Sequence, residues 1–83
     1  MSLKTRAQLR AARALLEWSQ VTLAAKSGVS LPTIKRLEPG NEPIRVRVDV
    51  LERLNQALVV AGVEFTNGDQ PGVRLKKKPE SSP

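Results

Sequence analysis

The 83-residue sequence contains no cysteine, no histidine and no tyrosine. Without thiols the chain can form neither a disulfide nor a thiolate metal site, and without histidine it lacks a common metal ligand and the commonest general base. Catalysis would have to rest on serine, lysine and carboxylates scattered along exposed positions. We therefore predict that the protein is not an enzyme and that it uses no metal and no cofactor.

Aromatic residues and long apolar runs are also scarce. Trp18 and Phe65 are the only aromatic residues, so the core must be aliphatic. Alanine and leucine recur at close spacing through the first two thirds of the chain, which favours helices over strands. No apolar run approaches the roughly 18 residues that span a bilayer, and residues 1–6 lack the apolar stretch of a signal peptide. We expect one small domain in the cytoplasm, without a membrane partner.

Acidic residues are outnumbered by basic ones, 8 to 14, which gives a formal net charge of +6. The excess is uneven, because residues 1–48 and 73–83 are basic whereas residues 49–72 are acidic overall. A basic front part and a basic tail favour a polyanionic partner such as nucleic acid. The alternative is that the charge serves solubility alone.

Apolar spacing and capping residues together predict helices. Ser19 and Ser30 are good N-caps, Pro32 suits a first helical turn, and Gly28 can end a helix in the left-handed conformation. Pro39-Gly40 stops the third helix. The expected helices cover residues 4–17, 20–27, 31–38 and 47–61, with a loop over 41–46.

Some apolar residues flank the expected helical stripes. Leu15 widens the stripe of the first helix, and Trp18 is expected to seal its junction with the second. Val50, Val59 and Val60 lie partly off the stripe of the fourth helix. They are candidates for a subunit interface; alternatively they cover the back of the first helix.

The apolar period changes to two after Gly62. Residues 63–66 and 73–76 alternate apolar and polar, and turn-forming residues separate them. We predict a hairpin that must pack on the helices or on a second copy, because a two-stranded ribbon is marginal by itself. Val63, Phe65, Val73 and Leu75 would share one face. The expected organisation is a helical domain over 1–62, a hairpin and dimerisation element over 63–76, and a disordered basic tail over 77–83.

A specific spacing runs through the second and third predicted helices. It reads Gln20-x-x-Leu23-Ala24-x-x-x-Gly28-Val29-x-x-x-x-Ile34-x-x-Leu37. Two short helices can cross steeply only where the residues at the crossing are small, a need that Ala24 meets, and Gly28 allows the tight turn between them. The larger apolar residues of the pattern are the expected buried contacts.

The stretch from Ser19 to Gly40 resembles the lambda-repressor/Cro-like family of bacterial and phage regulators, also called the xenobiotic-response-element (XRE) family. The resemblance covers about residues 5–61, and residues 61–75 resemble a tail found on small stand-alone regulators of this kind. It implies a mainly α fold, a four-to-five-helix lambda-repressor-like helix-turn-helix domain with a small C-terminal β-hairpin.

The same resemblance implies that the third helix enters the major groove of DNA. Arg36 is the first choice for a base contact, because its guanidinium can reach guanine O6 and N7 together; the alternative is a phosphate contact or a solvated charge. Gln20 would bind a phosphate unless it is an ordinary surface residue. Base contacts are implied for Leu31, Pro32, Lys35 and Arg36, and backbone contacts for Gln20, Ser30, Thr33, Asn41, Arg45 and Arg47.

Two features accompany this implied site. Arg13 and Glu38 occupy positions at which relatives carry an ion pair between the first and third helices, so we expect a structural pair. Leu31 and Pro32 depart from the family's pattern, which usually has a polar reader there. Neither side chain can donate a hydrogen bond, but both could pack on thymine methyl groups, and the departure leaves more room for recognition of DNA shape.

We therefore expect a sequence-specific double-stranded DNA-binding transcriptional regulator. A domain this small makes few contacts alone, so a homodimer on a palindromic operator is expected, with half-sites about one helical turn apart. The alternative is a helix-turn-helix module that docks on another regulator, like an antiactivator. RNA binding is a weaker third option, since the paired aromatics of single-strand modules are missing. No small-molecule ligand is expected.

Overall fold

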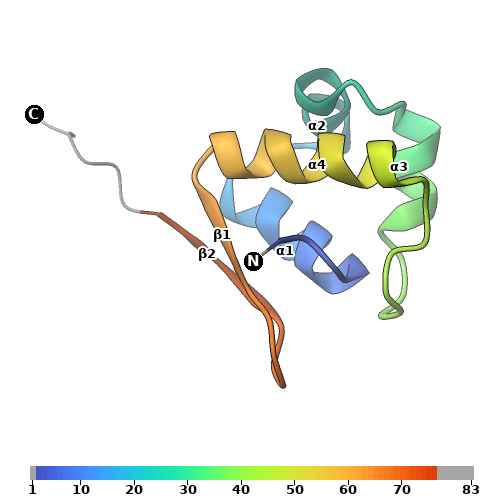
Figure 1. Ribbon diagram of the computed structural model, residues 1–83. Helices are drawn as coiled ribbons and strands as arrows, with labels where there is room; N and C mark the ends of the chain where they lie inside the picture. Colours follow the sequence, from blue (N-terminus) through green and yellow to red (C-terminus); the bar gives the residue numbers. More distant parts are fainter. Residues whose placement is uncertain (1, 77–83) are drawn as a thin grey trace, which may run out of the picture.

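A computed structural model describes residues 2–76 of the chain (Figure 1). The tail predicted over residues 77–83 lies outside the described residues. The described part contains four helices followed by a two-stranded antiparallel hairpin. The mainly helical architecture and the C-terminal hairpin are thus confirmed. None of the helices in residues 2–76 is long and apolar enough to cross a membrane.

The first helix, α1 (Arg6–Leu15), is shorter at both ends than predicted. It begins late because Thr5 is its N-cap: the hydroxyl accepts from the backbone N–H of Gln8, whose side chain in turn caps Thr5. It ends early because Glu17 adopts a left-handed conformation (φ 57°). Leu15, expected to widen the buried stripe, is 41% exposed at the last turn.

The next two helices have the predicted caps. In α2 (Gln20–Ser27) the Ser19 hydroxyl accepts from the N–H of Thr22, and Gly28 ends the helix at φ 76°. In α3 (Leu31–Leu37) the Ser30 hydroxyl accepts from the N–H of Thr33, and Pro32 lies in the first turn. These caps fix the short turn between α2 and α3.

The last elements are α4 (Val48–Val60), β1 (Val63–Thr66) and β2 (Gly72–Leu75). The strands pair with Val63 opposite Leu75 and Phe65 opposite Val73, so the four predicted apolar residues share one face. Strand β2 lies along α1 and β1 contacts α4, while α2 packs against both α3 and α4. Figure 1 shows the hairpin and α3 on opposite sides of α1.

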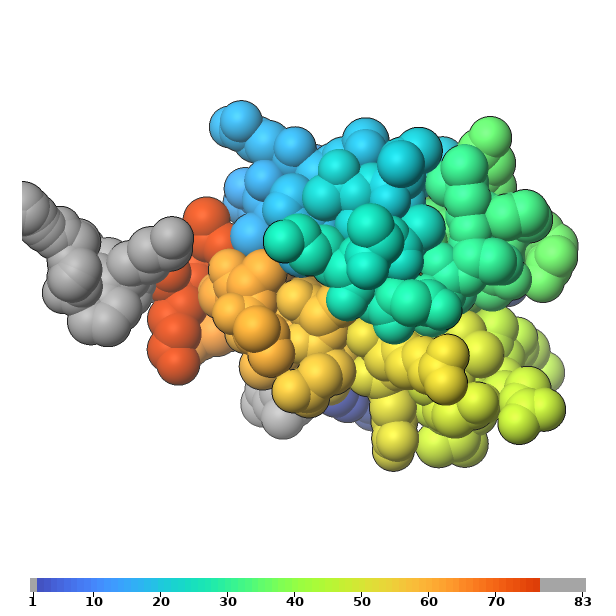
Figure 2. All heavy atoms as spheres, turned by 90° about the horizontal axis from the view of Figure 1, so that it is seen from above, coloured from blue at the N-terminus to red at the C-terminus, as the bar shows by residue number. Residues whose placement is uncertain are grey.

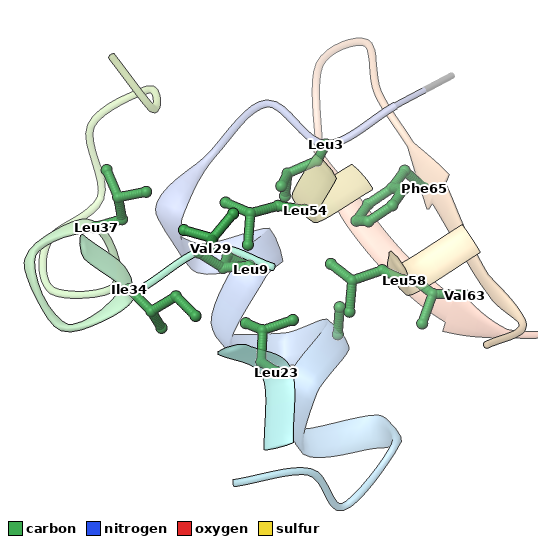
Figure 3. Close-up of a cluster of buried hydrophobic side chains, with 11 residues drawn as sticks. Leu3, Leu9, Leu23, Val29, Ile34, Leu37, Leu54, Leu58, Val63 and Phe65 are labelled. Carbon is green, nitrogen blue, oxygen red and sulfur yellow. The ribbon is translucent and has the colours of Figure 1, made fainter. Parts of the chain in front are cut away.

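The core forms where all four helices and the hairpin converge (Figure 3). Leu54 and Leu58 of α4 and Phe65 of β1 are among the buried side chains, and Leu3 joins them from outside the helices. Trp18 is half-buried and packs against this core, as does Val50. The buried hydrophobic residues of this core are Leu3, Leu9, Ala12, Leu23, Val29, Ile34, Leu37, Leu54, Leu58, Val63 and Phe65.

Candidate nucleic-acid interface

Helix α3 lies at one end of the molecule and presents a single face to the outside (Figures 1 and 2). Ile34 and Leu37 point into the core. On the other face Lys35 and Arg36 are exposed. A short helix held by two buried anchors and covered on one side only is a suitable element for insertion into a groove.

The first turn of α3 brings together the remaining implied base and phosphate contacts. Pro32 is exposed and Leu31 is half-buried, so an apolar tip precedes the two cations. Ser30 is exposed, and its hydroxyl lies 2.9 Å from that of Thr33. Both hydroxyls are therefore engaged locally while remaining at the surface beside Pro32.

Glu38, the residue that follows α3, is almost fully buried and receives bonds from two other helices. Its carboxylate accepts from Arg13 Nε at 2.7 Å and Nη2 at 2.9 Å. Arg13 also donates to the carbonyl of Trp18 at 2.9 Å. The hydrogen bond to Glu38 raises the pKa of the Arg13 guanidinium, and burial opposes that shift. The bidentate geometry fixes α1 against the end of α3.

Gln20, implied as a phosphate contact, is half-buried at the start of α2. Its side-chain amide donates to Oε1 of Glu38 at 3.0 Å. One of the two N–H groups of the amide is thus engaged inside the protein, while the second N–H and the side-chain oxygen are left for other partners.

Arg6 and Arg10 have roles that the apolar pattern did not indicate. Arg6 Nη1 donates to the carbonyls of Arg36 at 3.0 Å and Leu37 at 3.1 Å. Arg10 Nη1 donates to the carbonyls of Glu38 and Gly40, the latter at 2.6 Å. These carbonyls have no helical partner because Pro39 and Gly40 end the helix.

We call the bonds from Arg6 and Arg10 to these carbonyls the clamp, and the sequence contained a signal for it. Arg6, Arg10 and Arg13 stand at helical spacing, so they form one stripe along α1. A row of guanidinium groups is a favourable partner for the negative end of a helix. The missing information was which helix end the row would meet.

The loop between α3 and α4 is tied to the start of α1. The N–H of Ile44 donates to the carbonyl of Lys4 at 2.9 Å, and the N–H of Arg6 donates to the carbonyl of Glu42 at 3.4 Å. Figure 2 shows this loop next to α3 at the same end of the molecule. The backbone therefore places the implied phosphate contacts of the loop beside α3.

Three implied phosphate contacts belong to this loop. Asn41 is exposed, and its Oδ1 accepts from Arg10 at 3.3 Å. Arg47 donates to Oδ1 of Asp49 at 3.1 Å, a bond that holds the pKa of the Asp49 carboxyl below its ordinary value. Arg45 is exposed and, with Lys35 and Arg36, forms no ion pair within residues 2–76. Two unpaired cations therefore belong to α3 itself, and a third lies in the loop that follows it.

A family model described as helix-turn-helix matches residues 9–64, which run from α1 into β1 and include both α2 and α3. No curated protein matches the chain.

Proposed function

Because the chain belongs to the lambda-repressor/Cro-like (XRE) family of helix-turn-helix proteins, we propose that it is a cytoplasmic transcriptional regulator that binds a specific double-stranded DNA sequence. Helix α3 enters the major groove in this proposal. The protein acts by binding and has no catalytic role.

The observation that carries the proposal is the division of arginines between two tasks. Arg6, Arg10 and Arg13 are used inside the protein to hold the end of α3. Arg36 and Arg45 are exposed and carry no internal ion pair in the described residues. A rigidly held helix with free cations on its outer face supplies both the positioning and the charge that groove recognition needs.

Base recognition is assigned to the outer face of α3. Arg36 reads guanine through O6 and N7, and Lys35 supports it at a neighbouring base or phosphate. Leu31 and Pro32 form an apolar tip that fits thymine methyl groups, so we expect A·T pairs next to the guanine.

Phosphate contacts are assigned to the edges of that face. Ser30 and Thr33 lie at the start of α3, and Gln20 approaches a phosphate through its backbone at the start of α2. Asn41, Arg45 and Arg47 flank α3 from the loop. Since each neutralised phosphate releases counterions, affinity falls steeply as salt rises.

We expect a homodimer on a palindromic operator. One domain of this size covers little DNA, and a two-fold pair doubles the contacts while matching the symmetry of a palindrome. Half-sites about one helical turn apart follow from this arrangement.

A second function is favoured by one observation. Leu31 and Pro32 form an apolar tip on the very element that would read bases, and such a tip also suits a protein partner. In this alternative the domain docks on another regulator, as an antiactivator does, and the surrounding cations would require an acidic partner surface.

Fluorescence anisotropy with a labelled random duplex, titrated at several salt concentrations, tests the proposal. The matched pair of variants is Arg36→Ala on α3 and Arg74→Ala on the hairpin, each of which removes one positive charge. Wild type should bind on the order of micromolar or tighter at low salt and lose affinity as salt rises. Arg36→Ala should weaken binding more than Arg74→Ala does. Absence of binding at low salt would contradict the proposal and favour the protein-docking alternative.

A further inference from the structure

Arg6 uses only one side of its guanidinium group in the clamp. Its Nη1 donates to the carbonyls of Arg36 at 3.0 Å and Leu37 at 3.1 Å. Neither Nε nor Nη2 forms a hydrogen bond within residues 2–76, and Nε is the only buried side-chain nitrogen or oxygen there that lacks a partner. Such an exception calls for an explanation. Nε and Nη2 together form the edge with which a guanidinium binds two oxygens of one anion, so Arg6 can still take an anion there.

Arg13, on the same stripe of α1, shows the geometry of a filled edge. Its Nε and Nη2 hold the carboxylate of Glu38 at 2.7 and 2.9 Å, and the Glu38 side chain is only 5% exposed. Glu42 is the acid next to Arg6, but its Oε1 lies 3.6 Å from Nε and its side chain is 71% exposed. Because 3.6 Å is too long for a hydrogen bond, Glu42 lies over the edge of Arg6 without filling it.

The side chain of Glu42 folds back over its own loop. Gly40 permits this, because a Cβ added there would collide with Oε1 of Glu42. The backbone N–H of Arg6 also donates to the carbonyl of Glu42 at 3.4 Å, and Figure 1 shows the first turn of α1 beside the loop that joins α3 to α4. The backbone therefore keeps the carboxylate near Arg6, while the exposed side chain is free to turn away.

This edge of Arg6 lies next to the proposed DNA contacts. Arg6 bonds to the carbonyl of Arg36, the proposed base contact, and Glu42 directly follows Asn41, a proposed phosphate contact. Within residues 18–48, all of which the structure describes, Glu42 is the only acidic side chain that is exposed. Its negative charge opposes the approach of phosphates, because such repulsion acts over about 10 Å at 0.1 M salt.

We propose that the Nε and Nη2 edge of Arg6 binds a phosphate of the DNA backbone and that Glu42 covers this site in the free protein. When the duplex docks, the Glu42 side chain turns outward and two phosphate oxygens replace its carboxylate. Arg6 then holds α3 with one side of its guanidinium and the DNA with the other. Glu42 thereby lowers the affinity for every duplex, whatever its sequence. The inference rests on the proposed function and adds a phosphate site to it.

Anisotropy titrations of Glu42→Gln on a random duplex, at several salt concentrations, test the site. Glutamine keeps the size of the side chain but removes the negative charge from Arg6. The variant should bind about three to ten times more tightly than wild type. The slope of log affinity against log salt should become steeper by about 1, because the phosphate no longer has to replace an acid. An unchanged affinity or an unchanged slope would overturn the site.

Glu64→Gln is the matched control. Glu64 also pairs with an arginine, since its Oε1 lies 2.6 Å from Arg74 Nε, and its loss changes the net charge by the same amount. The hairpin that carries it lies on the other side of α1 from α3 (Figure 1). Glu64→Gln should therefore keep the affinity and the slope of wild type, and circular dichroism confirms that both variants are folded. Equal gains in the two variants would mean that net charge alone is responsible and would overturn the site.

A second measurement uses the wild-type protein. In an NMR spectrum of the arginine Nε–H groups, the Arg6 signal should shift when duplex is added, because Nε gains an oxygen partner. The Arg13 signal is the internal control and should move little, since its Nε already donates to Glu38. Inorganic phosphate at the same concentration of phosphate groups should leave the Arg6 signal in place, because only a docked duplex holds a phosphate there. An Arg6 signal that stays in place with duplex, or that moves equally with inorganic phosphate, would overturn the proposal.

The outcomes separate the Arg6 site from the function that it refines. If wild type fails to bind the duplex at low salt, the proposed function fails and the site fails with it. If wild type binds but Glu42→Gln behaves like Glu64→Gln, the site alone fails and binding of DNA stands.

Discussion

The side-chain amide of Gln20 donates to Oε1 of Glu38 at 3.0 Å, which joins the first residue of α2 to the residue that follows α3. The same carboxylate accepts two bonds from Arg13 on α1. One buried acid therefore connects three helices. Because Glu38 directly follows α3, this network fixes the orientation of α3 relative to the core.

The clamp formed by Arg6 and Arg10, which lie on the same stripe of α1 as Arg13, holds the same helix end through backbone carbonyl groups. Arg6 and Arg10 donate to backbone oxygens of residues 36–40. The Glu38 network and the clamp both act on the C-terminal end of α3. The helix is therefore fixed at that end by residues of α1 and α2, while Lys35 and Arg36 stay exposed. The orientation of the outer face is thus set by residues that do not belong to it.

Glu38→Gln should lower the free energy of unfolding by about 2–3 kcal/mol, near the lower end for a broken buried pair because Arg13 is partly accessible. Urea unfolding followed by circular dichroism measures the loss. In the double variant Arg13→Met/Glu38→Gln the loss should be smaller than the sum of the single losses, since no charge is stranded. Additive losses would mean that the two side chains are not coupled.

The exposed ion pair of the hairpin is the control for that cycle. Arg74 Nε lies 2.6 Å from Glu64 Oε1, but the Arg74 side chain is 73% exposed. Glu64→Gln should therefore change the free energy of unfolding by less than about 1 kcal/mol. A loss as large as that of Glu38→Gln would show that burial does not account for the difference.

Gln8 connects the hairpin to α1, and Gln8→Glu should detach it. The buried amide donates to the carbonyls of Thr66 and Gly72, both at 3.1 Å, while its oxygen accepts from the N–H groups of Lys4 and Thr5. Glutamate keeps the capping oxygen but faces the carbonyls without a donor. We expect a loss of about 1–3 kcal/mol and faster amide hydrogen exchange in β1 and β2, with α2 and α3 unaffected. Uniform acceleration across all helices would contradict this assignment.

Much of the fold could be predicted from short-range patterns. Ser19, Ser30 and Gly28 act within a few residues of their own position, so their caps follow from local chemistry, and the alternation of Val63 and Phe65 shows which face of the hairpin is apolar. The helix ends were predicted less well. The start of α1 depends on the reciprocal capping of Thr5 and Gln8, which the apolar spacing does not indicate.

The structural support of the site was harder to predict because it depends on contacts between distant residues. Arg13 and Glu38 could be named only through the family resemblance. Arg10 shows no partner in the sequence, because the carbonyls it binds become available only when Pro39 and Gly40 end α3 beside α1. The bond from the Gln20 amide to Glu38 could not be predicted either, because only folding brings these two residues close.

Arg47→Ala should raise the pKa of the Asp49 carboxyl toward its ordinary value of 3.8. The hydrogen bond from Arg47 is the main cause of the lowered pKa, so its removal leaves only the smaller effect of the backbone N–H groups of Val50 and Asp49. An NMR titration of the Asp49 side chain measures the change, and Arg45→Ala is the control that should leave it unaltered. The pKa of Asp49 is lower in the folded protein than in the unfolded chain. The bond therefore stabilises the fold fully at pH values above the ordinary pKa, and this stabilisation is lost as the pH falls through the folded-state pKa.

Base contacts and phosphate contacts should differ in how the affinity lost on their removal depends on DNA sequence and on salt. Once an operator has been selected from a random duplex library, anisotropy is compared for Arg45→Ala and Arg36→Ala on that operator and on a random duplex. Arg45 lies in the loop beside α3, so its loss should weaken both complexes equally and reduce the slope of log affinity against log salt by about 1. Arg36 lies on the outer face of α3, so its loss should cost about 1–3 kcal/mol on the operator and much less on the random duplex.

A single comparison decides between these roles. If Arg36 reads a base, the ratio of operator to random affinity falls in Arg36→Ala by about tenfold or more and stays constant in Arg45→Ala. If both variants leave that ratio unchanged while reducing the salt slope, Arg36 is a phosphate contact. Specificity would then have to come from Leu31, Pro32 and the deformability of the DNA, and exchange of the A·T pairs that Leu31 and Pro32 contact would be the change that lowers affinity most.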